Sequence, residues 1–167
     1  MKVRDYIPRE RKETDDLVIC ETEEDYGAAR ELIQAYSDSI GVDLRLQNID
    51  HELENLKTFY GPPTGMIILA REEGEFVGDI CFRNLGDFIA EIKRMYVKPE
   101  YRNRGIGRKL LERAKQEAKG LGYRFIRLDT VPEMESAINL YLSAGFYEIE
   151  SYAYSPYSGT RFMEYNL

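Results

Sequence analysis

Residues 102–108 have the composition of an anion-binding loop. They read Arg-Asn-Arg-Gly-Ile-Gly-Arg and connect an apolar-rich run, 89–97, to an amphipathic run, 109–118. The first N–H groups of a helix have no acceptors within the helix, so they can bind a phosphate together. Gly105 and Gly107 leave the backbone accessible to an anion, and the arginines of the loop add charge in a geometry that matches phosphate oxygens. The segment therefore predicts a site for a pyrophosphate group.

Spacing excludes two common ligands of such loops. The Walker A motif of ATP-binding proteins requires GxxxxGK followed by Ser or Thr, whereas Gly107 is followed by Arg108, Lys109 and Leu110. The dinucleotide fingerprint GxGxxG requires a third glycine, and Leu110 stands in its place. The loop alone still leaves open a plain helix start, in which Gly105 caps the helix and Gly107 allows close packing.

Length and composition limit the class of protein to which the chain can belong. The chain has 167 residues, within the size of one domain, and a net charge of −7, which argues against nucleic-acid or anionic-membrane partners. No apolar run approaches the roughly 20 residues that cross a bilayer, and the charged start, 1–16, has no signal-peptide core, so we expect a cytoplasmic protein. Cys20 and Cys81 lie in apolar runs without CxxC spacing, and His51 is the only histidine, so no metal site is expected.

The hydrophobic pattern predicts an α/β fold. Capping signals, glycines and prolines divide the chain into apolar runs and amphipathic runs. The expected strands are 17–21, 65–71, 75–82, 88–97, 125–130, 146–154 and 161–166, and the expected helices are 23–39, 43–59, 105–120 and 132–144. The order β α α β β β α β α β β implies one mixed, mostly antiparallel sheet with helices on both faces. We expect a single domain at 17–167 preceded by an extension at 1–16.

Two segments together resemble a known superfamily. Arg102-x-x-Gly105-x-Gly107, preceded by Glu91-Ile-Lys-Arg-Met-Tyr-Val97 and Pro99, resembles the acyl-CoA-binding motif of the GNAT N-acetyltransferases. The later segment 137–146, Ala-Ile-Asn-Leu-Tyr-Leu-Ser-Ala-Gly-Phe, is similar to their second motif, AxxLYxxxGF. The motifs and the elements that join them cover about 88–146, and the order of elements is similar to the superfamily from residue 17 to residue 167.

The resemblance implies where acetyl-CoA, as co-substrate, binds. In such proteins the end of the fourth strand offers backbone groups to the pantetheine arm, so Met95, Tyr96 and Val97 would flank that arm. One position departs from the family: many relatives carry Asn three residues before the motif alanine, where this chain has Met134, so one polar contact to CoA is missing from the pattern. The glycine loop binds the pyrophosphate, which here implies the amides of Arg102, Asn103, Arg104, Gly105, Ile106, Gly107 and Arg108.

Acyl transfer to an amine needs a neutral nucleophile, a polarised carbonyl and a proton for the departing thiolate. The resemblance makes Glu91 the candidate general base, directly or through water, and the alternative is a strand-edge carboxylate paired with Lys93 or an arginine. Tyr141 matches the family tyrosine that binds or protonates the CoA sulfur, and the alternative is a buried core tyrosine. Carbonyl polarisation would fall to a backbone N–H near residues 95–97.

The acceptor is not encoded in any motif. Alternation along a strand predicts that Lys93 shares a face with Glu91 and that Arg94 faces the other side. Lys93 could hold an acceptor carboxylate or simply neutralise Glu91, the interpretation we favour. Tyr154 and Tyr157, near a turn, could line an acceptor pocket, although packing is the first explanation for the tyrosines of this region.

The sequence thus predicts an enzyme that moves an acetyl group from acetyl-CoA to a primary amine by direct attack in a ternary complex. The acceptor is a small molecule or a protein amine. The alternative is a non-catalytic acyl-CoA sensor or regulatory module of the same fold, and a third is a CoA-binding interaction domain. The resemblance also leaves a homodimer open.

Overall fold

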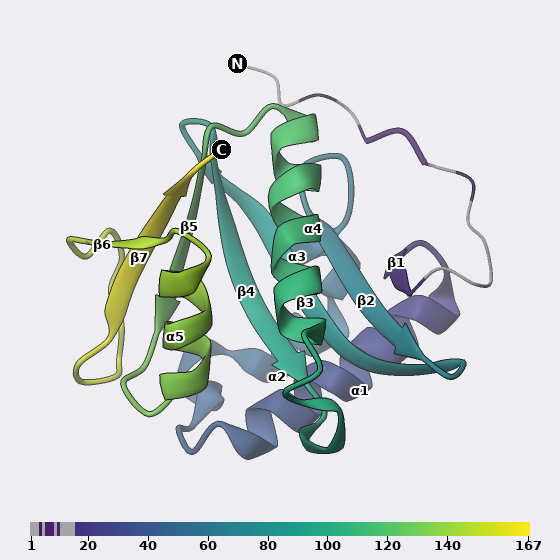
Figure 1. Ribbon diagram of the computed structural model, residues 1–167, viewed down its shortest axis with the longest axis horizontal. Coiled ribbons are helices and arrows are strands. Elements are labelled where there is room, and N and C mark those ends of the chain that lie inside the picture. Colours follow the sequence, from purple (N-terminus) through teal and green to yellow (C-terminus); the bar gives the residue numbers. More distant parts are fainter. Residues whose placement is uncertain (1–3, 5, 9, 11–15) are drawn as a thin grey trace.

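A computed structural model describes residues 4, 6–8, 10 and 16–167 of the protein (Figure 1). Its strands are β1 (Leu17–Ile19), β2 (Met66–Glu72), β3 (Glu75–Gly86), β4 (Ile89–Val97), β5 (Phe125–Thr130), β6 (Tyr147–Ile149) and β7 (Arg161–Asn166). Its helices are α1 (Glu23–Ser39), α2 (Ile49–Glu54), α3 (Leu56–Tyr60), α4 (Ile106–Leu121) and α5 (Glu135–Ser143), with 3₁₀ turns η1 (Leu44–Gln47) and η2 (Pro99–Tyr101).

The described strands form one sheet in the order β1-β2-β3-β4-β5-β7-β6. β4 and β5 are parallel, and the other neighbouring strands are antiparallel. In Figure 1, α4 and α5 lie in front of the sheet and α1 to α3 lie behind it. The predicted α/β class, the mixed sheet and the helices on both faces are therefore confirmed.

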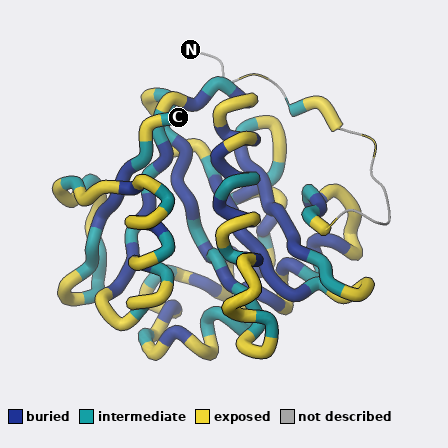
Figure 2. The backbone as a smooth tube through the Cα atoms, viewed as in Figure 1, coloured by how far each residue is buried: buried dark blue, intermediate teal, exposed yellow. Residues whose placement is uncertain are grey.

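Continuous apolar runs give the central strands two buried faces, as the tube in Figure 2 shows. On β2, Ile68 belongs to the core under α4, whereas Ile67 and Leu69 belong to the core under α1. On β4, Ala90 and Ile92 belong to the α4 core. Fully burying each such aliphatic side chain stabilises the fold by roughly 1.5–3 kcal/mol, so the sheet is a rigid platform for whatever its strand ends carry.

Helix α1 begins at a capping box. The Thr22 hydroxyl accepts the N–H of Asp25 at 3.2 Å, and the Asp25 carboxylate accepts the N–H of Thr22 at 2.9 Å. The expected single helix at 43–59 is wrong, because it is broken into η1, α2 and α3. Asn48 has a φ of +58°, a left-handed conformation that asparagine tolerates better than most residues, and it separates η1 from α2.

Other boundaries also differ from prediction. β3 continues to Gly86, past the expected end at residue 82, because the polar residues that follow still pair with β4. α5 begins at Glu135, after a turn in which the N–H of Met134 bonds to Val131, so Pro132 lies before the helix. β6 spans Tyr147–Ile149 and ends well before residue 154. Gly145 does follow α5 with a φ of +92°, as its predicted place after the helix requires.

The predicted extension 1–16 lies mostly outside the described residues, and it stays a prediction. Of its described part, the N–H of Arg4 bonds to the carbonyl of Leu121 at 2.8 Å, and the Tyr6 hydroxyl bonds to Glu21 at 2.7 Å. Among the residues that the structure describes, no helix is long and apolar enough to cross a membrane.

Candidate active site

The site begins where β4 and β5 part. In the described structure these strands pair at three positions, Ile89 with Phe125, Ala90 with Ile126 and Glu91 with Arg127. Beyond them β4 continues to Val97 while β5 diverges, so the later backbone groups on that edge of β4 have no strand beside them (Figure 1). An open strand edge can accept an extended amide-containing chain, as an added strand would be accepted.

A bulge in β4 shapes this opening. Arg94 has a φ of +55°, and the register with β3 shifts at the same place. Ile92 packs in the α4 core and Met95 packs against it, with two residues between them instead of one. The side chains of Lys93 and Arg94 therefore both lie on the side of the sheet opposite to Ile92. The prediction that alternation would separate Lys93 from Arg94 is wrong, because a bulge inserts one extra residue into the alternation.

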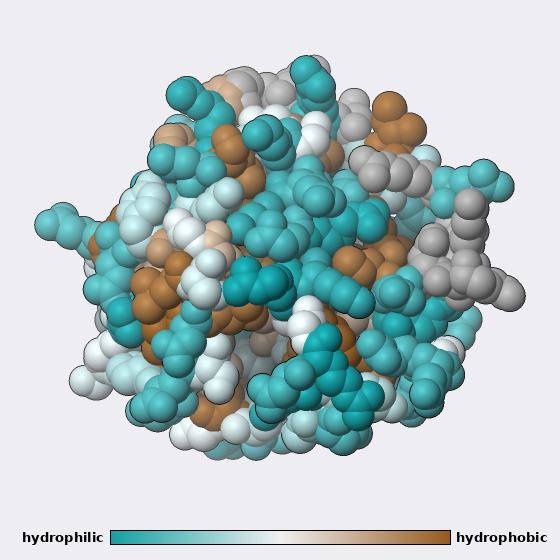
Figure 3. Space-filling view, in the orientation of Figure 1, coloured by the Kyte–Doolittle hydropathy of each residue, from teal (hydrophilic) through white to brown (hydrophobic). Residues whose placement is uncertain are grey.

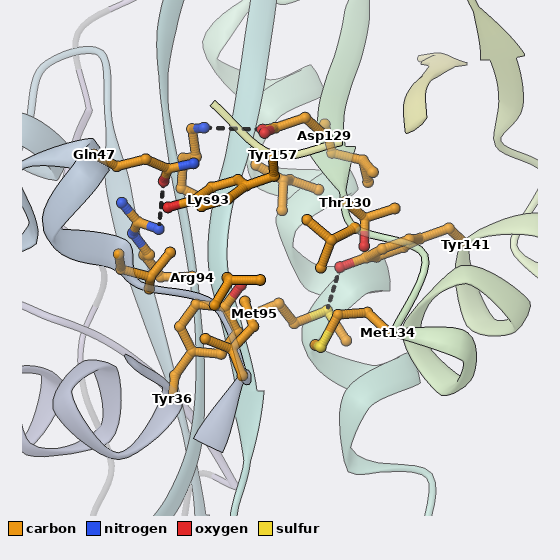
Figure 4. A pocket seen from close by; sticks show the side chains of 16 residues that line it. Tyr36, Gln47, Lys93, Arg94, Met95, Asp129, Thr130, Met134, Tyr141 and Tyr157 are labelled. Carbon is orange, nitrogen blue, oxygen red and sulfur yellow. Dashed lines mark hydrogen bonds and ion pairs between the residues drawn. The ribbon is translucent and has the colours of Figure 1, made fainter. Parts of the chain in front are cut away.

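A small cavity of about 50 Å³ lies at the point of divergence (Figure 4). Its walls come from β4, from the end of β5, from α1 and the segment after it, from α5, and from the segment between β6 and β7. The polar side chains and methionines that line it are Tyr36, Gln47, Lys93, Arg94, Met95, Asp129, Thr130, Met134, Tyr141 and Tyr157.

Arg94 fastens the cavity wall to α2. Its guanidinium donates two hydrogen bonds to Glu52, at 2.8 and 2.9 Å, and one to Gln47 at 3.0 Å. Tyr60 donates to the same carboxylate at 2.8 Å. Burial alone would raise the pKa of Glu52, but the hydrogen bonds and charge of Arg94 outweigh it, and the pKa is lowered. Arg94 is thus held in a buried pair, and the sequence signal for it was a cation within an apolar strand.

Lys93 spans the gap between the two strands. Its ammonium lies 2.9 Å from Asp129 Oδ1 on β5 and 3.7 Å from Glu91 Oε1 on its own strand. The preferred interpretation of Lys93, neutralisation of Glu91, is thus part of a wider arrangement that includes Asp129. Sequence reasoning missed Asp129, although its place at the end of a strand parallel to β4 was a signal that could have found it.

Glu91 lies beside the cavity and not among the residues that line it. It is 3% exposed. Its Oε2 accepts the Nε–H of Arg83 at 2.9 Å, and its Oε1 accepts the hydroxyl of Tyr152 at 3.1 Å. Both carboxylate oxygens therefore accept hydrogen bonds within the protein, and the part that Glu91 plays as a base stays a prediction. The alternative named above, pairing with Lys93 or an arginine, describes its contacts.

Tyr141 extends from α5 into the cavity, where its hydroxyl lies 3.9 Å from the sulfur of Met95 (Figure 4). Its ring packs against Phe146 with centroids 5.8 Å apart. Burial, followed by the nearby Tyr36 and Asp129, raises the pKa of Tyr141 well above its ordinary value. The phenol is therefore neutral at neutral pH.

The glycine loop forms the predicted helix start. Gly105 precedes α4 with a φ of +79°, and Asn103 has a φ of +62°. No side chain caps this end of α4, so its first N–H groups remain available to a ligand. A Cβ on Gly107 would lie 3.2 Å from Met95 Cε and 3.3 Å from Leu140 Cδ2, so this glycine brings α4 close to both β4 and α5.

The side chains of the loop turn back onto the protein. Arg102 donates to the carbonyl of Val97 at 2.8 Å, Arg104 donates to the carbonyl of Glu100 at 3.1 Å, and Arg108 bonds to the hydroxyl of Ser143. The Ile106 side chain is buried in the α4 core. For Ile106 only the backbone can therefore face a ligand, while the arginines stay exposed and add positive charge.

Of the two tyrosines proposed for the acceptor pocket, the structure brings one to the cavity. Tyr157 lines it and donates its hydroxyl to the carbonyl of Asp43 at 2.9 Å. Tyr154 is 91% exposed and does not line the cavity, because β6 ends early and the chain carries it outward. Tyr96 lies in the α1 core, where the guanidinium of Arg102 sits 5.6 Å from its ring centre.

This arrangement fits an acyl-CoA. The open edge of β4 at Met95–Val97 suits the amides of a pantetheine arm, and the uncapped, glycine-bearing start of α4 suits a pyrophosphate. Figure 3 shows the α4 and α5 face, which is hollowed between these helices, with hydrophobic side chains at the α5 side of the hollow and hydrophilic ones at the α4 side. Among the described residues, no three His, Cys, Asp or Glu side chains are placed to hold a metal ion.

Known proteins resemble this chain in sequence and in fold. The profile of the acetyltransferase (GNAT) family matches residues 29–146. The chain is 36% identical to an uncharacterized N-acetyltransferase of Schizosaccharomyces pombe over 81% of this chain and 85% of that protein. An acetyltransferase of the GNAT family from Staphylococcus aureus Mu50 matches with a TM-score of 0.75 and 26% identity over 90% of this chain and 98% of its own.

A PaiA N-acetyltransferase from Thermoplasma acidophilum, solved in complex with coenzyme A, matches in fold with a TM-score of 0.71 and 20% identity, over 90% of this chain and 99% of its own. The family match covers both the glycine loop and the second motif. The chain belongs to the acetyltransferase (GNAT) family.

Proposed function

We propose that the protein transfers an acetyl group from acetyl-CoA to a primary amine by direct attack in a ternary complex. The observation that carries the proposal is that one cavity, at the divergence of β4 and β5, holds the Tyr141 hydroxyl and adjoins the open edge of β4. The glycine loop that follows β4 then supplies the anion site at the same end of the sheet. The family match and the coenzyme A complex of the PaiA relative support this choice of co-substrate.

Acetyl-CoA supplies an activated thioester, and the protein holds it at two places. The amides of residues 102–108 receive the pyrophosphate, where the exposed arginines add charge. The edge of β4 at Met95–Val97 receives the pantetheine arm, and backbone N–H groups there polarise the carbonyl. Tyr141 is the proton donor for the departing sulfur, because its neutral phenol reaches the cavity from α5.

The acceptor must also lose a proton, since an ammonium ion has no lone pair with which to attack. The sequence makes Glu91 the candidate base, and the structure adds a second carboxylate, Asp129, within the cavity itself. A covalent route through the enzyme finds little support: of the described residues, neither Cys nor Ser lines the cavity, and burial raises the pKa of Cys81 well above its usual value.

The second candidate is a non-catalytic acyl-CoA sensor, favoured by Met134 at the cavity in place of the family asparagine. One experiment separates the two. Binding of CoA is measured by calorimetry, and thiol release from acetyl-CoA is followed across alkylamines, amino acids, an aminoglycoside and a peptide with a free α-amine. We expect amine-dependent thiol release with at least one acceptor. Binding of CoA without thiol release on any amine would favour the sensor.

A further inference from the structure

We propose that Asp129 is the carboxylate that binds the acceptor ammonium and accepts its proton, with Lys93 as its positioning residue. This inference rests on the proposed function. Asp129 lies on β5 just past the last position at which β5 pairs with β4, and its side chain lines the cavity. The side chain is 17% exposed, enough for contact with a ligand in the cavity. In Figure 4, Asp129 and Tyr141 both extend from the β5 and α5 side toward β4.

The ion pairs around Lys93 assign different roles to the two carboxylates. Glu91 is 4% exposed at its side chain, and Arg83 and Tyr152 occupy its two oxygens. Lys93 lies between Glu91 and Asp129, closer to Asp129 by 0.8 Å, the difference between 3.7 and 2.9 Å. Glu91 therefore helps to position the ammonium of Lys93, and that ammonium in turn binds one oxygen of Asp129. The other oxygen of Asp129 is the one that we assign to the acceptor.

The remaining charged groups at the cavity are paired. Arg94 is neutralised by its two hydrogen bonds to Glu52. The tyrosines that face Asp129 come from α1, from α5 and from the segment after β6, and the pKa of each is raised, chiefly by burial and further by the charge of Asp129. They are Tyr36, Tyr141, Tyr152 and Tyr157. Neutral phenols and a carboxylate suit an ammonium group. Among the described residues that line the cavity, both cations, Lys93 and Arg94, are in ion pairs, so we assign the acceptor's ammonium group rather than a carboxylate to this place.

The chemical steps balance without any further reagent. The acceptor ammonium gives one proton to the free oxygen of Asp129, and the nitrogen lone pair then forms a bond to the thioester carbonyl carbon. The carbon–sulfur bond breaks, and the sulfur takes the proton of the Tyr141 hydroxyl. Tyr141 regains a proton from the nitrogen, and Asp129 releases its proton to solvent. The products are the acetamide, free CoA thiol and one proton.

The test compares Asp129→Asn with the wild-type protein, using the amine with the highest kcat/KM in the panel. We expect kcat/KM at pH 7 to fall by about 100-fold, the usual contribution of a general base. The difference in kcat/KM between the variant and wild type should become smaller as the pH approaches the pKa of the amine itself, because more of the amine is then already neutral in solution. If Asp129 had a purely structural role, the difference in kcat/KM would not depend on pH in this way.

Binding gives a readout that does not depend on turnover. With CoA bound, the amine should bind Asp129→Asn about tenfold or more weakly, since a charge-assisted hydrogen bond is lost, while CoA affinity in the absence of amine stays unchanged. Asp129→Ser is a second neutral variant with the same expected results, should the first not fold. Glu164→Gln is the matched control, because Glu164 pairs with Arg127 on β5 at 2.7 Å but does not line the cavity.

Three results would overturn the inference. If Asp129→Asn keeps the wild-type pH profile and amine affinity while wild type turns over, Asp129 is not the base. If Glu91→Gln shows the pH-dependent loss and Asp129→Asn does not, the base is Glu91. If wild type binds CoA but acetylates no amine, the proposed function fails, and the inference fails with it.

Discussion

At the scale of single residues, the proposed proton transfer to sulfur depends on Tyr141. Its hydroxyl reaches the cavity, and its raised pKa keeps the phenol neutral at neutral pH. We predict that Tyr141→Phe lowers kcat by about 100-fold, because only the proton donor is removed. CoA affinity should change little, since the ring still packs against Phe146. The measurement is thiol release at saturating acetyl-CoA and amine.

Tyr154 provides the matched control for that variant. It is 91% exposed, so Tyr154→Phe removes the same hydroxyl group at a site away from the cavity. Its kcat should equal that of wild type. Full activity in Tyr141→Phe would show that the Tyr141 hydroxyl is not the proton donor.

Residue identity alone could not rank the two carboxylates near the cavity. The motif pointed to Glu91, and the family position of that residue is clear from the sequence. What the sequence could not show is that Arg83 and Tyr152 bind both of its oxygens, because these partners come from β3 and from the segment after β6. Asp129 has no motif of its own, and only the parting of β4 and β5 brings it to Lys93.

At the scale of elements, the start of α4 is the part most directly tied to binding. Gly105 has a φ of +79°, which disfavours any residue with a Cβ. An added Cβ would meet no atom outside its chain neighbours, so glycine is required by the backbone conformation and not by lack of space. We predict that Gly105→Ala strains the loop by about 1–2 kcal/mol and weakens CoA binding. Calorimetric titration with CoA and urea unfolding measure the two effects.

Gly74 is a matched control for this strain. It lies in the turn between β2 and β3 with a φ of +83°, and an added Cβ there would also meet nothing. Gly74→Ala should lose similar stability but bind CoA as wild type does. Equal CoA affinity in both variants would mean that the glycine loop does not hold the pyrophosphate.

Element boundaries followed the local strength of the sequence signal. The strand at 125–130 and the strand at 161–166 match prediction, because each is a short run with apolar or aromatic residues that follows a glycine-containing turn. The helix expected at 43–59 and the alternation expected at 93–94 fail for a common reason. A left-handed residue, Asn48 between η1 and α2 and Arg94 in β4, resets the periodicity without changing the hydrophobic pattern, and the break between α2 and α3 lies at Asn55, whose backbone is not helical.

At the scale of the whole molecule, Asp79 couples stability to pH. It is fully buried on β3, and its Oδ1 has no hydrogen-bond partner among the described residues. Burial raises its pKa well above the ordinary value. Between the unfolded and folded pKa values, the unfolded chain ionises and the folded chain does not, so the stability linked to Asp79 is full at low pH and is lost as the pH rises.

Asp79→Asn should remove this dependence. We predict that the free energy of unfolding of wild type, relative to the variant, falls as the pH rises above about 4, by up to about 1.4 kcal/mol per pH unit. Urea unfolding of both proteins between pH 4 and pH 7 measures the difference in their free energies of unfolding. The contributions of the other titrating groups cancel in this difference. Parallel stability curves for the two proteins would contradict a neutral, buried Asp79.

The most direct test of acetyl transfer at the β4–β5 cavity is an initial-rate measurement in which acetyl-CoA and amine are varied together. Direct attack requires both substrates to be bound at once, so double-reciprocal plots should give intersecting lines, with thiol release that depends on the amine. Parallel lines, the signature of a covalent acyl-enzyme, or thiol release at the same rate without amine would contradict direct transfer in this cavity.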